Sequence, residues 1–376
     1  MKILYVHTTP LNSKMANLLQ IVQMANAFSD LGHDVTLLLP TPKGEIKRLN
    51  RNVTLRFYER VLQSRKYELF NIFRINKIAK EIGPDLCYTR TVWPMFSLLI
   101  HEHPFVFEAH DLTLHQGSKL LNWIFKKIIL RSIRYQNFLL FVSISQNLLS
   151  NWKKSGLESA KTFVAHDGFD KNIFVEYDSI KEKSRWAFEP DKKVVTYTGS
   201  LYPDREIETI LKLANHFRDV LFIIAGGPQS QRSVYESLSK EQGLQNIHFL
   251  GHIEHSEIPS LLAASDILLA IWSEKVPTID YCSPLKLFEY MASGKTIVAH
   301  GFPTIKEVLD DNVTAYLATS SSYISLVEKL TIAIEEYPNV EMIMNVKKKA
   351  FDNYSWQKRA EGILIRLKQI APKRLF

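Results

Sequence analysis

The stretch PTIDYCSPLKLFEYMASGKTIVAH, residues 277–300, decides how the second half of the chain folds. Leu285, Phe288 and Met291 recur at helical spacing, so LKLFEYMAS is predicted to form a short helix that ends at Gly294. The following TIVAH has the unbroken apolar character of a buried strand. The stretch therefore predicts a loop, a helix and a strand, which together are the repeating unit of an α/β domain.

The start of this predicted helix is suited to bind a phosphate group. The loop through Ser283 and Pro284 and the first turn from Leu285 bring free backbone N–H groups and the positive end of the helix dipole together. Lys286 adds a positive charge at the same place. Glu289 follows one turn later, and its carboxylate can accept two hydrogen bonds from a ribose diol. These residues predict a site for a nucleoside diphosphate.

SPLKLFEYMASGKTIV resembles the nucleotide-sugar motif of retaining glycosyltransferases of the GT-B fold, in the group called family 4. That family carries two acids with seven residues between them. The second acid contacts the ribose, and the first lies near the donor sugar. Glu289 matches the second acid, whereas the first position holds Tyr281, with Asp280 beside it. The resemblance implies that Asp280 and Tyr281 lie on the sugar side of the site.

GSLYPDRE, residues 199–206, is a second match to the family. The usual pattern has Arg directly after the glycine and Lys five residues later, both on the diphosphate. Here Ser200 takes the first place and Arg205 the second. We expect Arg205 and Lys286 to neutralise the leaving diphosphate. The other donor contacts that the resemblance implies are Gly199 and Ser200 in this loop, Gly226 and Gly227 in a glycine-rich loop, and the backbone of His252 and Ile253.

The first half of the chain alternates strands and amphipathic helices, which predicts a parallel doubly wound sheet. Ligands of such sheets bind at the carboxyl ends of the strands. His7 and Lys14 in the first loop, and Arg90 after PDLCYT, are therefore predicted on the acceptor or sugar side. FEAHDL matches the family where its histidine faces the donor sugar. His110 is thereby predicted to be catalytic, together with Arg205, Lys286 and Glu289.

A chain of 376 residues exceeds what one hydrophobic core usually organises, so two domains are expected. AHDGFDKNIF resembles the interdomain crossover of the family, and FDNYSWQKRAEGILIRLKQ resembles its terminal helix. The resemblance implies a GT-B fold with two Rossmann-like domains facing a cleft. Residues 1–170 would bind the acceptor, joined by a crossing helix within residues 355–376. Residues 171–354 would bind the nucleotide-sugar.

Charge is distributed unevenly along the chain. Residues 1–172 carry 23 Lys and Arg against 13 Asp and Glu, residues 173–346 carry 15 against 24, and residues 347–376 carry 9 against 2. This asymmetry favours an anionic partner for the first domain, such as a membrane surface, a lipid diphosphate or an acidic glycan. No nucleic-acid reader motif accompanies the charge, so no nucleic-acid partner is predicted.

Residues 118–137 combine Leu121, Phe125, Ile128 and Tyr135 along one predicted side with Lys127, Arg131 and Arg134 along another. With Trp123, this pattern is typical of a basic helix that lies on an anionic bilayer. The competing interpretation is an ordinary outer helix that packs on its own sheet.

Cysteine and metal patterns limit the chemistry. Cys87 and Cys282 have no CxxC or zinc-ligand spacing, and no DxD-type signature is present, so we expect a reducing compartment, no metal and no cofactor.

No run approaches the roughly 20 apolar residues of a spanning helix. MKILYVHTTP has a strand pattern and lacks signal-peptide features. The expected location is the cytoplasm, with peripheral contact to the inner membrane face as a further possibility.

The function predicted from the resemblance is transfer of a sugar from a UDP- or GDP-sugar to a glycan or lipid-linked acceptor, with retention, in the synthesis of a surface polysaccharide or glycoconjugate. Two alternatives stay open: a nucleotide-sugar 2-epimerase of the same fold, and a non-catalytic protein that binds nucleotide-sugars. A dehydrogenase is disfavoured, because HTTPLNSKM after the first strand has no GxGxxG.

Overall fold

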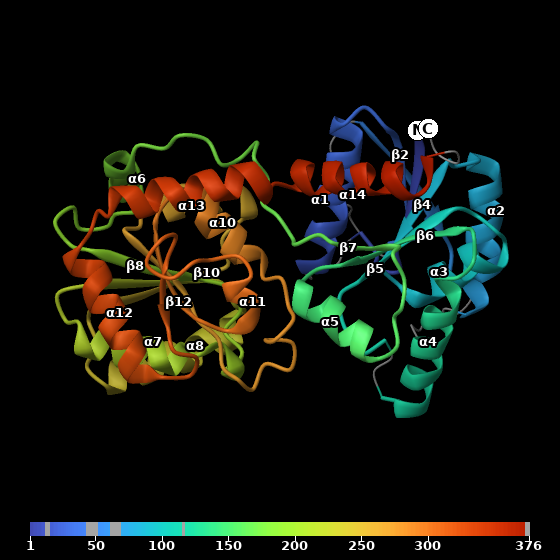
Figure 1. The fold of residues 1–376 in the computed structure, drawn as a ribbon. Coiled ribbons are helices and arrows are strands. Elements are labelled where there is room, and N and C mark those ends of the chain that lie inside the picture. Colours follow the sequence, from blue (N-terminus) through green and yellow to red (C-terminus); the bar gives the residue numbers. More distant parts are fainter. Residues whose placement is uncertain (12–15, 43–51, 61–68, 115–116, 373–376) are drawn as a thin grey trace. The chain divides into compact units, whose positions relative to one another are not determined.

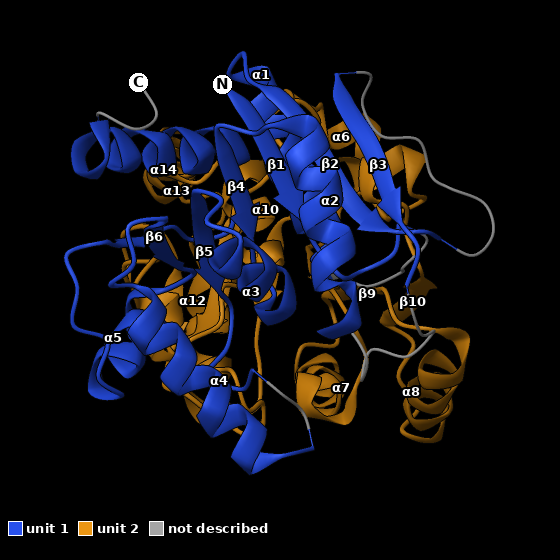
Figure 2. Ribbon diagram, turned by 90° about the vertical axis from the view of Figure 1, so that its right-hand side faces the viewer, with its two compact units in different colours: residues 1–167, 356–376 blue, residues 168–355 orange. Residues whose placement is uncertain are grey.

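The chain divides into two compact units. In unit 1, residues 1–167 combine with residues 356–376, and unit 2 comprises residues 168–355 (Figure 2). The structure, a computed structural model, describes residues 1–11, 16–42, 52–60, 69–114 and 117–372. The limits of the units lie close to the predicted domain boundaries. Each unit is a parallel sheet covered by helices on both faces, which confirms the predicted α/β fold class (Figure 1).

The sheet of unit 1 contains seven strands over the described residues. They are β1 (Lys2–Val6), β2 (Asp34–Pro40), β3 (Val53–Tyr58), β4 (Leu86–Thr89), β5 (Phe105–Ala109), β6 (Phe138–Ser143) and β7 (Thr162–Val164). All neighbouring strands are parallel, in the order β3-β2-β1-β4-β5-β6-β7. The chain therefore reverses its direction of winding between β1 and β4, the place where doubly wound sheets bind their ligands.

Six helices of unit 1 lie in the described part of the chain: α1 (Ala16–Asp30), α2 (Ile72–Ile82), α3 (Val92–Ile100), α4 (Lys119–Ser132), α5 (Gln146–Lys154) and α14 (Trp356–Ile370). The terminal helix α14 packs against α1 and β6 (Figure 1). Trp356, Ala360, Ile363 and Leu367 form its buried face, at the spacing of one helix side. Helix α14 therefore belongs to unit 1, although it comes last in the chain.

Helix α4 covers most of residues 118–137, the segment that was predicted to form a basic helix. It begins after Ser118, whose side chain accepts a hydrogen bond from the Leu121 amide. Its buried side is formed by Phe125 and Ile129, because these side chains pack into unit 1. Of the residues on the predicted apolar side, Phe125 is buried, whereas Leu121 is 37% exposed and Tyr135, beyond the end of the helix, is 60% exposed.

The sheet of unit 2 contains six strands over the described residues. They are β8 (Val194–Thr198), β9 (Leu221–Ala225), β10 (Ile247–Gly251), β11 (Ile267–Ala270), β12 (Thr296–His300) and β13 (Tyr316–Ala318). All neighbours are parallel, in the order β10-β9-β8-β11-β12-β13. The reversal of winding lies between β8 and β11.

Two layers of helices cover this sheet (Figure 1). The helices of unit 2 are α6 (Ser179–Arg185), α7 (Ile207–His216), α8 (Gln229–Glu241), α9 (Ile258–Ala263), α10 (Leu285–Ser293), α11 (Pro303–Lys306), α12 (Tyr323–Glu335) and α13 (Val340–Asn353). One core joins the sheet to α7, α8 and α12, and another joins it to α10 and α13. The predicted helix of residues 285–293 and the strand of residues 296–300 form as α10 and β12, and Gly294 ends α10 with a left-handed φ of 62°.

The loops after β8, β9 and β10 lie against one another through glycines. The Gly199 amide donates to the Ala225 carbonyl at 2.9 Å, and the Gly226 amide donates to the Gly251 carbonyl at 2.6 Å. A Cβ on Gly226 would lie 2.0 Å from the Gly199 carbonyl oxygen. Glycine is required there because no side chain fits between two backbones at this separation.

We predict that Gly226→Ala destabilises unit 2 by about 3 kcal/mol or more, because backbone strain and a steric clash add. Gly243→Ala is the matched control. Gly243 also has a left-handed φ, 64°, but a Cβ added there would meet no atom within 4 Å. Its substitution should cost only about 1 kcal/mol. Urea unfolding midpoints measure both, and equal losses would contradict the packing argument.

Candidate functional site

The Lys286 amine lies between two aromatic rings at the carboxyl edge of the unit 2 sheet. Its Nζ is 3.8 Å from the centre of the Tyr197 ring and 4.5 Å from that of Trp272. Tyr197 lies at the end of β8 and Trp272 follows β11, so the two rings flank the reversal of winding. No described residue forms a hydrogen bond or ion pair with this amine. Its N–H groups therefore have no acceptor within the described protein.

A second cation lies beside the first. Arg205 ends the short 3-10 helix η2 (Pro203–Arg205) after β8, and its side chain is 27% exposed. Its Nε is 3.7 Å from an oxygen of Asp204, a distance too long for a strong ion pair. Burial and the charge of Arg205 hold the pKa of Lys286 well below its usual value. Two neighbouring cations of this kind favour the binding of an anion.

Glu289 lies one turn after Lys286 on α10 and is 12% exposed. Its Oε1 is 2.8 Å from Nε2 of His255, in the 3-10 helix η3 (His255–Glu257) after β10. Burial lowers the pKa of His255, but the hydrogen bond to Glu289 and the negative charges of Glu289 and Asp170 together more than offset this, so the net shift is upward. Sequence reasoning missed His255. In GHIEHSEIP it selected His252, whose side chain is 77% exposed and 3.8 Å from Glu254.

The other predicted donor contacts lie in or after β8, β9 and β10 and at the start of α10. Tyr197 donates its hydroxyl to the Ser200 carbonyl at 3.0 Å, which orders the loop that begins at Gly199. Gly227 packs against Leu201 of the same loop, and a Cβ there would lie 2.5 Å from Leu201 Cγ. Ile253 packs against a third buried cluster of unit 2, which includes Leu221 and Ile223 of β9. Ser283 is buried, and Pro284 and Leu285 begin α10.

Asp280 and Tyr281 belong to a tight turn before α10. The Tyr281 amide donates to the Thr278 carbonyl at 3.0 Å. Asp280 is exposed and Tyr281 is half-buried. Their contact with a sugar stays a prediction.

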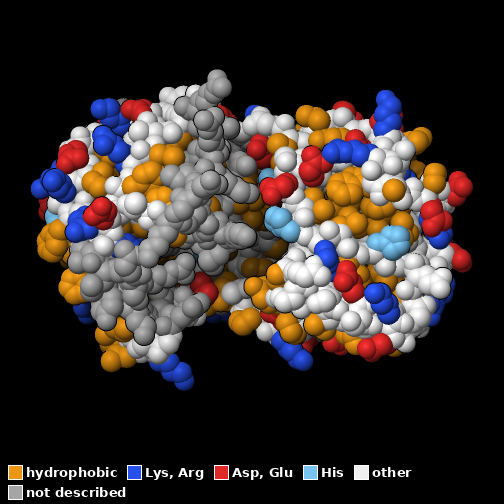
Figure 3. Space-filling model, turned by 180° about the vertical axis from the view of Figure 1, so that it is seen from behind, with side chains coloured by type: hydrophobic (Ala, Val, Ile, Leu, Met, Phe, Trp, Pro, Cys, Tyr) orange, Lys and Arg blue, Asp and Glu red, His pale blue; other side chains and the backbone are white. Residues whose placement is uncertain are grey.

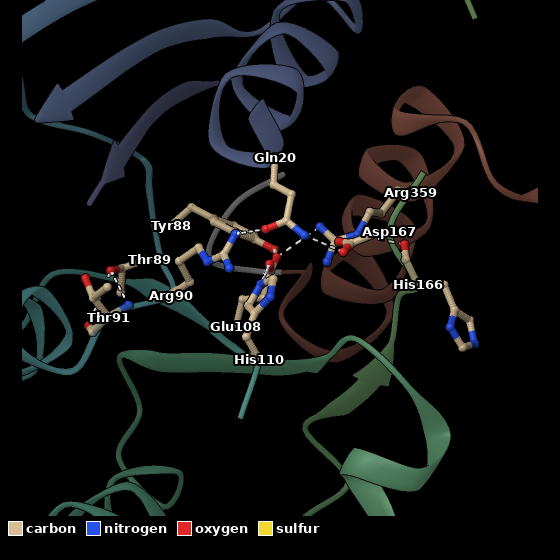
Figure 4. Close-up of polar contacts among 10 residues, drawn as sticks. All are labelled: Gln20, Tyr88, Thr89, Arg90, Thr91, Glu108, His110, His166, Asp167 and Arg359. Carbon is tan, nitrogen blue, oxygen red and sulfur yellow. Dashed lines mark hydrogen bonds and ion pairs between the residues drawn. The ribbon is translucent and has the colours of Figure 1, made fainter. Parts of the chain in front are cut away.

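In unit 1, the predicted residues Arg90 and His110 follow neighbouring strands β4 and β5 (Figure 4). Arg90 donates to the Gln20 side chain at 2.6 Å. Nε2 of His110 contacts Oε1 of the buried Glu108. Burial and the charge of Arg90 lower the pKa of His110 to about 4, although Glu108 opposes this. The imidazole is therefore neutral near pH 7.

The first loop of unit 1 contains the other two predicted residues. His7 is only 3% exposed, and its Nδ1 accepts a hydrogen bond from the Thr9 amide at 2.9 Å. This contact orders the chain directly after β1. Lys14 lies outside the described residues.

Both signs of charge occur on the surface of the described part of the chain. Lys and Arg side chains are mixed with Asp and Glu on the visible face of each unit (Figure 3). Among the described residues, no cluster of three or more His, Cys, Asp or Glu side chains has the arrangement of a metal site. No described helix is both long and apolar enough to cross a membrane. Cys87 and Cys282 form no disulfide.

Two family models match most of the chain. The model "Glycosyltransferase Family 4" matches residues 20–172, and "Glycosyl transferases group 1" matches residues 178–352. The chain belongs to this glycosyltransferase family. HepE of Anabaena, solved in complex with UDP and glucose, has the same GT-B fold, with a TM-score of 0.76, 20% identity and coverage of 98% of this chain and 99% of HepE. A glycosyltransferase from Rickettsia africae has a TM-score of 0.78 at 15% identity, with 99% of both chains covered.

One curated relative of this chain is D-inositol 3-phosphate glycosyltransferase of Mycobacterium tuberculosis. The two are 23% identical over 226 residues, which cover 57% of this chain and 46% of the relative. The chain therefore matches about half the length of this relative.

A buried carboxyl group in unit 1 makes stability depend on pH. Asp167 is 1% exposed and accepts a hydrogen bond from Gln20. Burial raises its pKa from 3.8 to about 6, although Arg359 opposes this. Between these two values the folded state keeps a proton that the unfolded state has lost. The contribution of Asp167 to stability therefore falls as pH rises from about 4 to about 6.

We predict that Asp167→Asn raises the melting temperature at pH 7.5, because the amide removes the cost of a buried charge. The gain in the free energy of unfolding at this pH is at most about 3 kcal/mol. It should shrink steadily toward pH 4, where the parent carboxyl is also neutral. Thermal unfolding from pH 4 to pH 8 measures this, and a loss of stability at pH 7.5 or a difference independent of pH would contradict it.

Proposed function

We propose that this protein transfers a sugar from a UDP- or GDP-sugar to a glycan or lipid-linked acceptor. The observation that carries the proposal is the pair of cations at the carboxyl edge of the unit 2 sheet. Lys286 forms no ion pair with an Asp or Glu of the described protein, and the charge of Arg205 is close enough to lower its pKa, although Cys282 opposes this. A bound diphosphate would supply the missing acceptors and compensate both charges.

Glu289 supports the nucleotide part of this proposal. Its Oε1 is held by His255, and a carboxylate has acceptor sites for further hydrogen bonds. A ribose diol would donate to it while the diphosphate lies one helix turn away. The helix start at Leu285 adds free N–H groups near the phosphates. The complexes of the structural neighbour HepE with UDP and with UDP-glucose also favour a nucleotide-sugar donor.

The chemistry that we propose uses electrostatics rather than a metal ion. Arg205 and Lys286 would stabilise the negative charge that develops on the diphosphate as the glycosidic bond breaks. His110, in its neutral form, would contact the donor sugar. We expect the new bond to form with retention, with the departing phosphate helping to deprotonate the acceptor.

Lys286→Met tests the diphosphate site directly. The substitution keeps the apolar stem between the Tyr197 and Trp272 rings and removes the charge. We predict at least a tenfold weaker affinity for UDP and GDP, because one charge-assisted contact is worth about 1.5–3 kcal/mol. Calorimetric titration measures this. Lys240→Met, an exposed lysine on α8, is the matched control and should bind as the parent does. Equal affinity for the parent and Lys286→Met would overturn the proposed site.

Turnover assays separate the proposed reaction from its alternatives. The protein is incubated with UDP- and GDP-sugars, with and without an acceptor extract, and the diphosphate and sugar products are followed. A transferase releases the diphosphate faster when acceptor is present. A 2-epimerase converts the donor sugar with no acceptor, and a binding protein retains affinity without turnover.

We further propose that α4 contacts an anionic bilayer on the cytoplasmic face of the membrane. Leu120 and Trp123 near the start of α4 are 66% and 58% exposed. Lys127 and Arg131 are exposed along the same helix, and no acidic residue occurs in residues 118–137. Exposed apolar side chains beside an unbalanced positive charge fit the interface of an anionic membrane.

We predict that the double variant Leu120→Ala, Trp123→Ala sediments at least tenfold less with phosphatidylglycerol vesicles than the parent. Binding of the parent should fall with added salt and be weak on phosphatidylcholine vesicles, because electrostatics contribute. Ile180→Ala is the matched control, since Ile180 is an 80% exposed apolar residue of unit 2. Equal binding by all three proteins would exclude α4 as the contact.

A further inference from the structure

Glu108 is the centre of a buried polar cluster in unit 1 (Figure 4). Its side chain is 2% exposed and lies at the end of β5. It accepts hydrogen bonds from the Tyr88 hydroxyl and from Nη1 of Arg359, the latter at 2.9 Å, and it contacts Nε2 of His110. Burial alone would raise the pKa of Glu108, but Arg359 and His110 lower it well below its usual value. Glu108 is therefore ionised near pH 7.

The ionised state of Glu108 decides where the His110 proton lies. A carboxylate has only acceptor atoms, so the nitrogen that contacts it must carry the hydrogen. Nε2 of His110 is that nitrogen. Because the ring is neutral near pH 7, Nδ1 carries a lone pair instead of a proton. No described residue forms a hydrogen bond with Nδ1, and the His110 side chain is 17% exposed.

We propose that Glu108 and Arg359 are positioning residues that hold His110 in the Nε2–H form, so that its Nδ1 accepts a hydrogen bond from a hydroxyl group of the donor sugar. The inference rests on the proposed function, because only a sugar substrate supplies that hydroxyl. It also gives the terminal helix α14 a role in the reaction, since Arg359 acts on His110 through Glu108.

Arg359 is suited to this role by its burial and its contacts. It is 2% exposed in its side chain, and its Nε donates to the His166 carbonyl at 2.9 Å. Its guanidinium thus lies in a fixed orientation, with Nη1 directed at Glu108. Without this cation, the buried Glu108 would lose the largest influence that keeps it ionised. A protonated Glu108 could donate to Nε2 and reverse the positions of donor and acceptor on His110.

A purely structural role for the cluster makes a different prediction. If the Glu108–Arg359 pair only anchors α14, its loss should lower stability without changing the tautomer of His110. Glu108→Gln separates the two roles. The glutamine has the same shape, but its amide group can donate to Nε2 and so favour the Nδ1–H form, the inverted tautomer.

The first test reads the tautomer in the parent protein, so it does not depend on any variant. Nitrogen-15 NMR of histidine-labelled protein, assigned with His110→Gln, should show His110 at pH 7.5 with Nε2 protonated and Nδ1 unprotonated. A protonated Nδ1 in the parent would overturn the proposal.

The second test separates turnover from donor binding. For Glu108→Gln we expect an inverted tautomer and a kcat for donor turnover at least about 100-fold lower, in line with the cost of a wrong histidine tautomer elsewhere. The affinity for UDP, which we assign to unit 2, should stay within twofold. Arg359→Met should lower kcat in the same way, and Arg359→Lys should restore part of it. Arg366→Met, on the same helix but with its guanidinium bonded to the Ala160 carbonyl instead of to Glu108, should leave kcat unchanged.

The outcomes are distinguishable. A Glu108→Gln variant that is folded and has the inverted tautomer, yet keeps the parent kcat, would overturn the role of Nδ1. If the variants do not fold, the tautomer of the parent still decides. If the parent binds neither UDP nor GDP, the proposed function fails, whereas the geometry of the His110 tautomer remains testable by NMR.

Discussion

A lysine amine held between two aromatic rings and close to an arginine is the interaction on which the chemistry of unit 2 depends. The faces of Tyr197 and Trp272 attract the ammonium form, while burial and the neighbouring charge of Arg205 oppose it. The N–H groups of this amine have no acceptor in the described protein. The ring contacts also keep the flexible side chain in place, so less conformational entropy is lost when an anion binds.

The sheet topology brings these groups together. Tyr197 lies at the end of β8 and Trp272 follows β11, and these two strands are neighbours although more than sixty residues of chain separate them. The glycine contacts between Gly199, Gly226 and Gly251 bring the adjacent loops close enough to share one surface. In unit 1 the same principle applies to β4 and β5, whose ends present Arg90 and His110, and to α14, which brings Arg359 to Glu108.

Much of the fold could be predicted from short-range patterns. The helical spacing of Leu285, Phe288 and Met291, followed by Gly294, predicted α10 correctly, because helix formation and termination depend on residues a few positions apart. The segment of α4 was less predictable. Its basic character was evident, but which apolar residues pack inward depends on the sheet beneath, so the sequence did not show that Phe125 is buried while Leu121 and Tyr135 are exposed.

The sequence alone determined the alternation of strands and helices, the family motifs and the presence of Arg205, Lys286 and Glu289 near the start of a helix or turn. Only the tertiary structure decided the partners of these residues. His255 contacts Glu289 across 34 positions and Arg359 contacts Glu108 across 251. Local periodicity carries no information about such contacts, because they arise from the order of strands in the sheet and from the packing of the terminal helix onto unit 1.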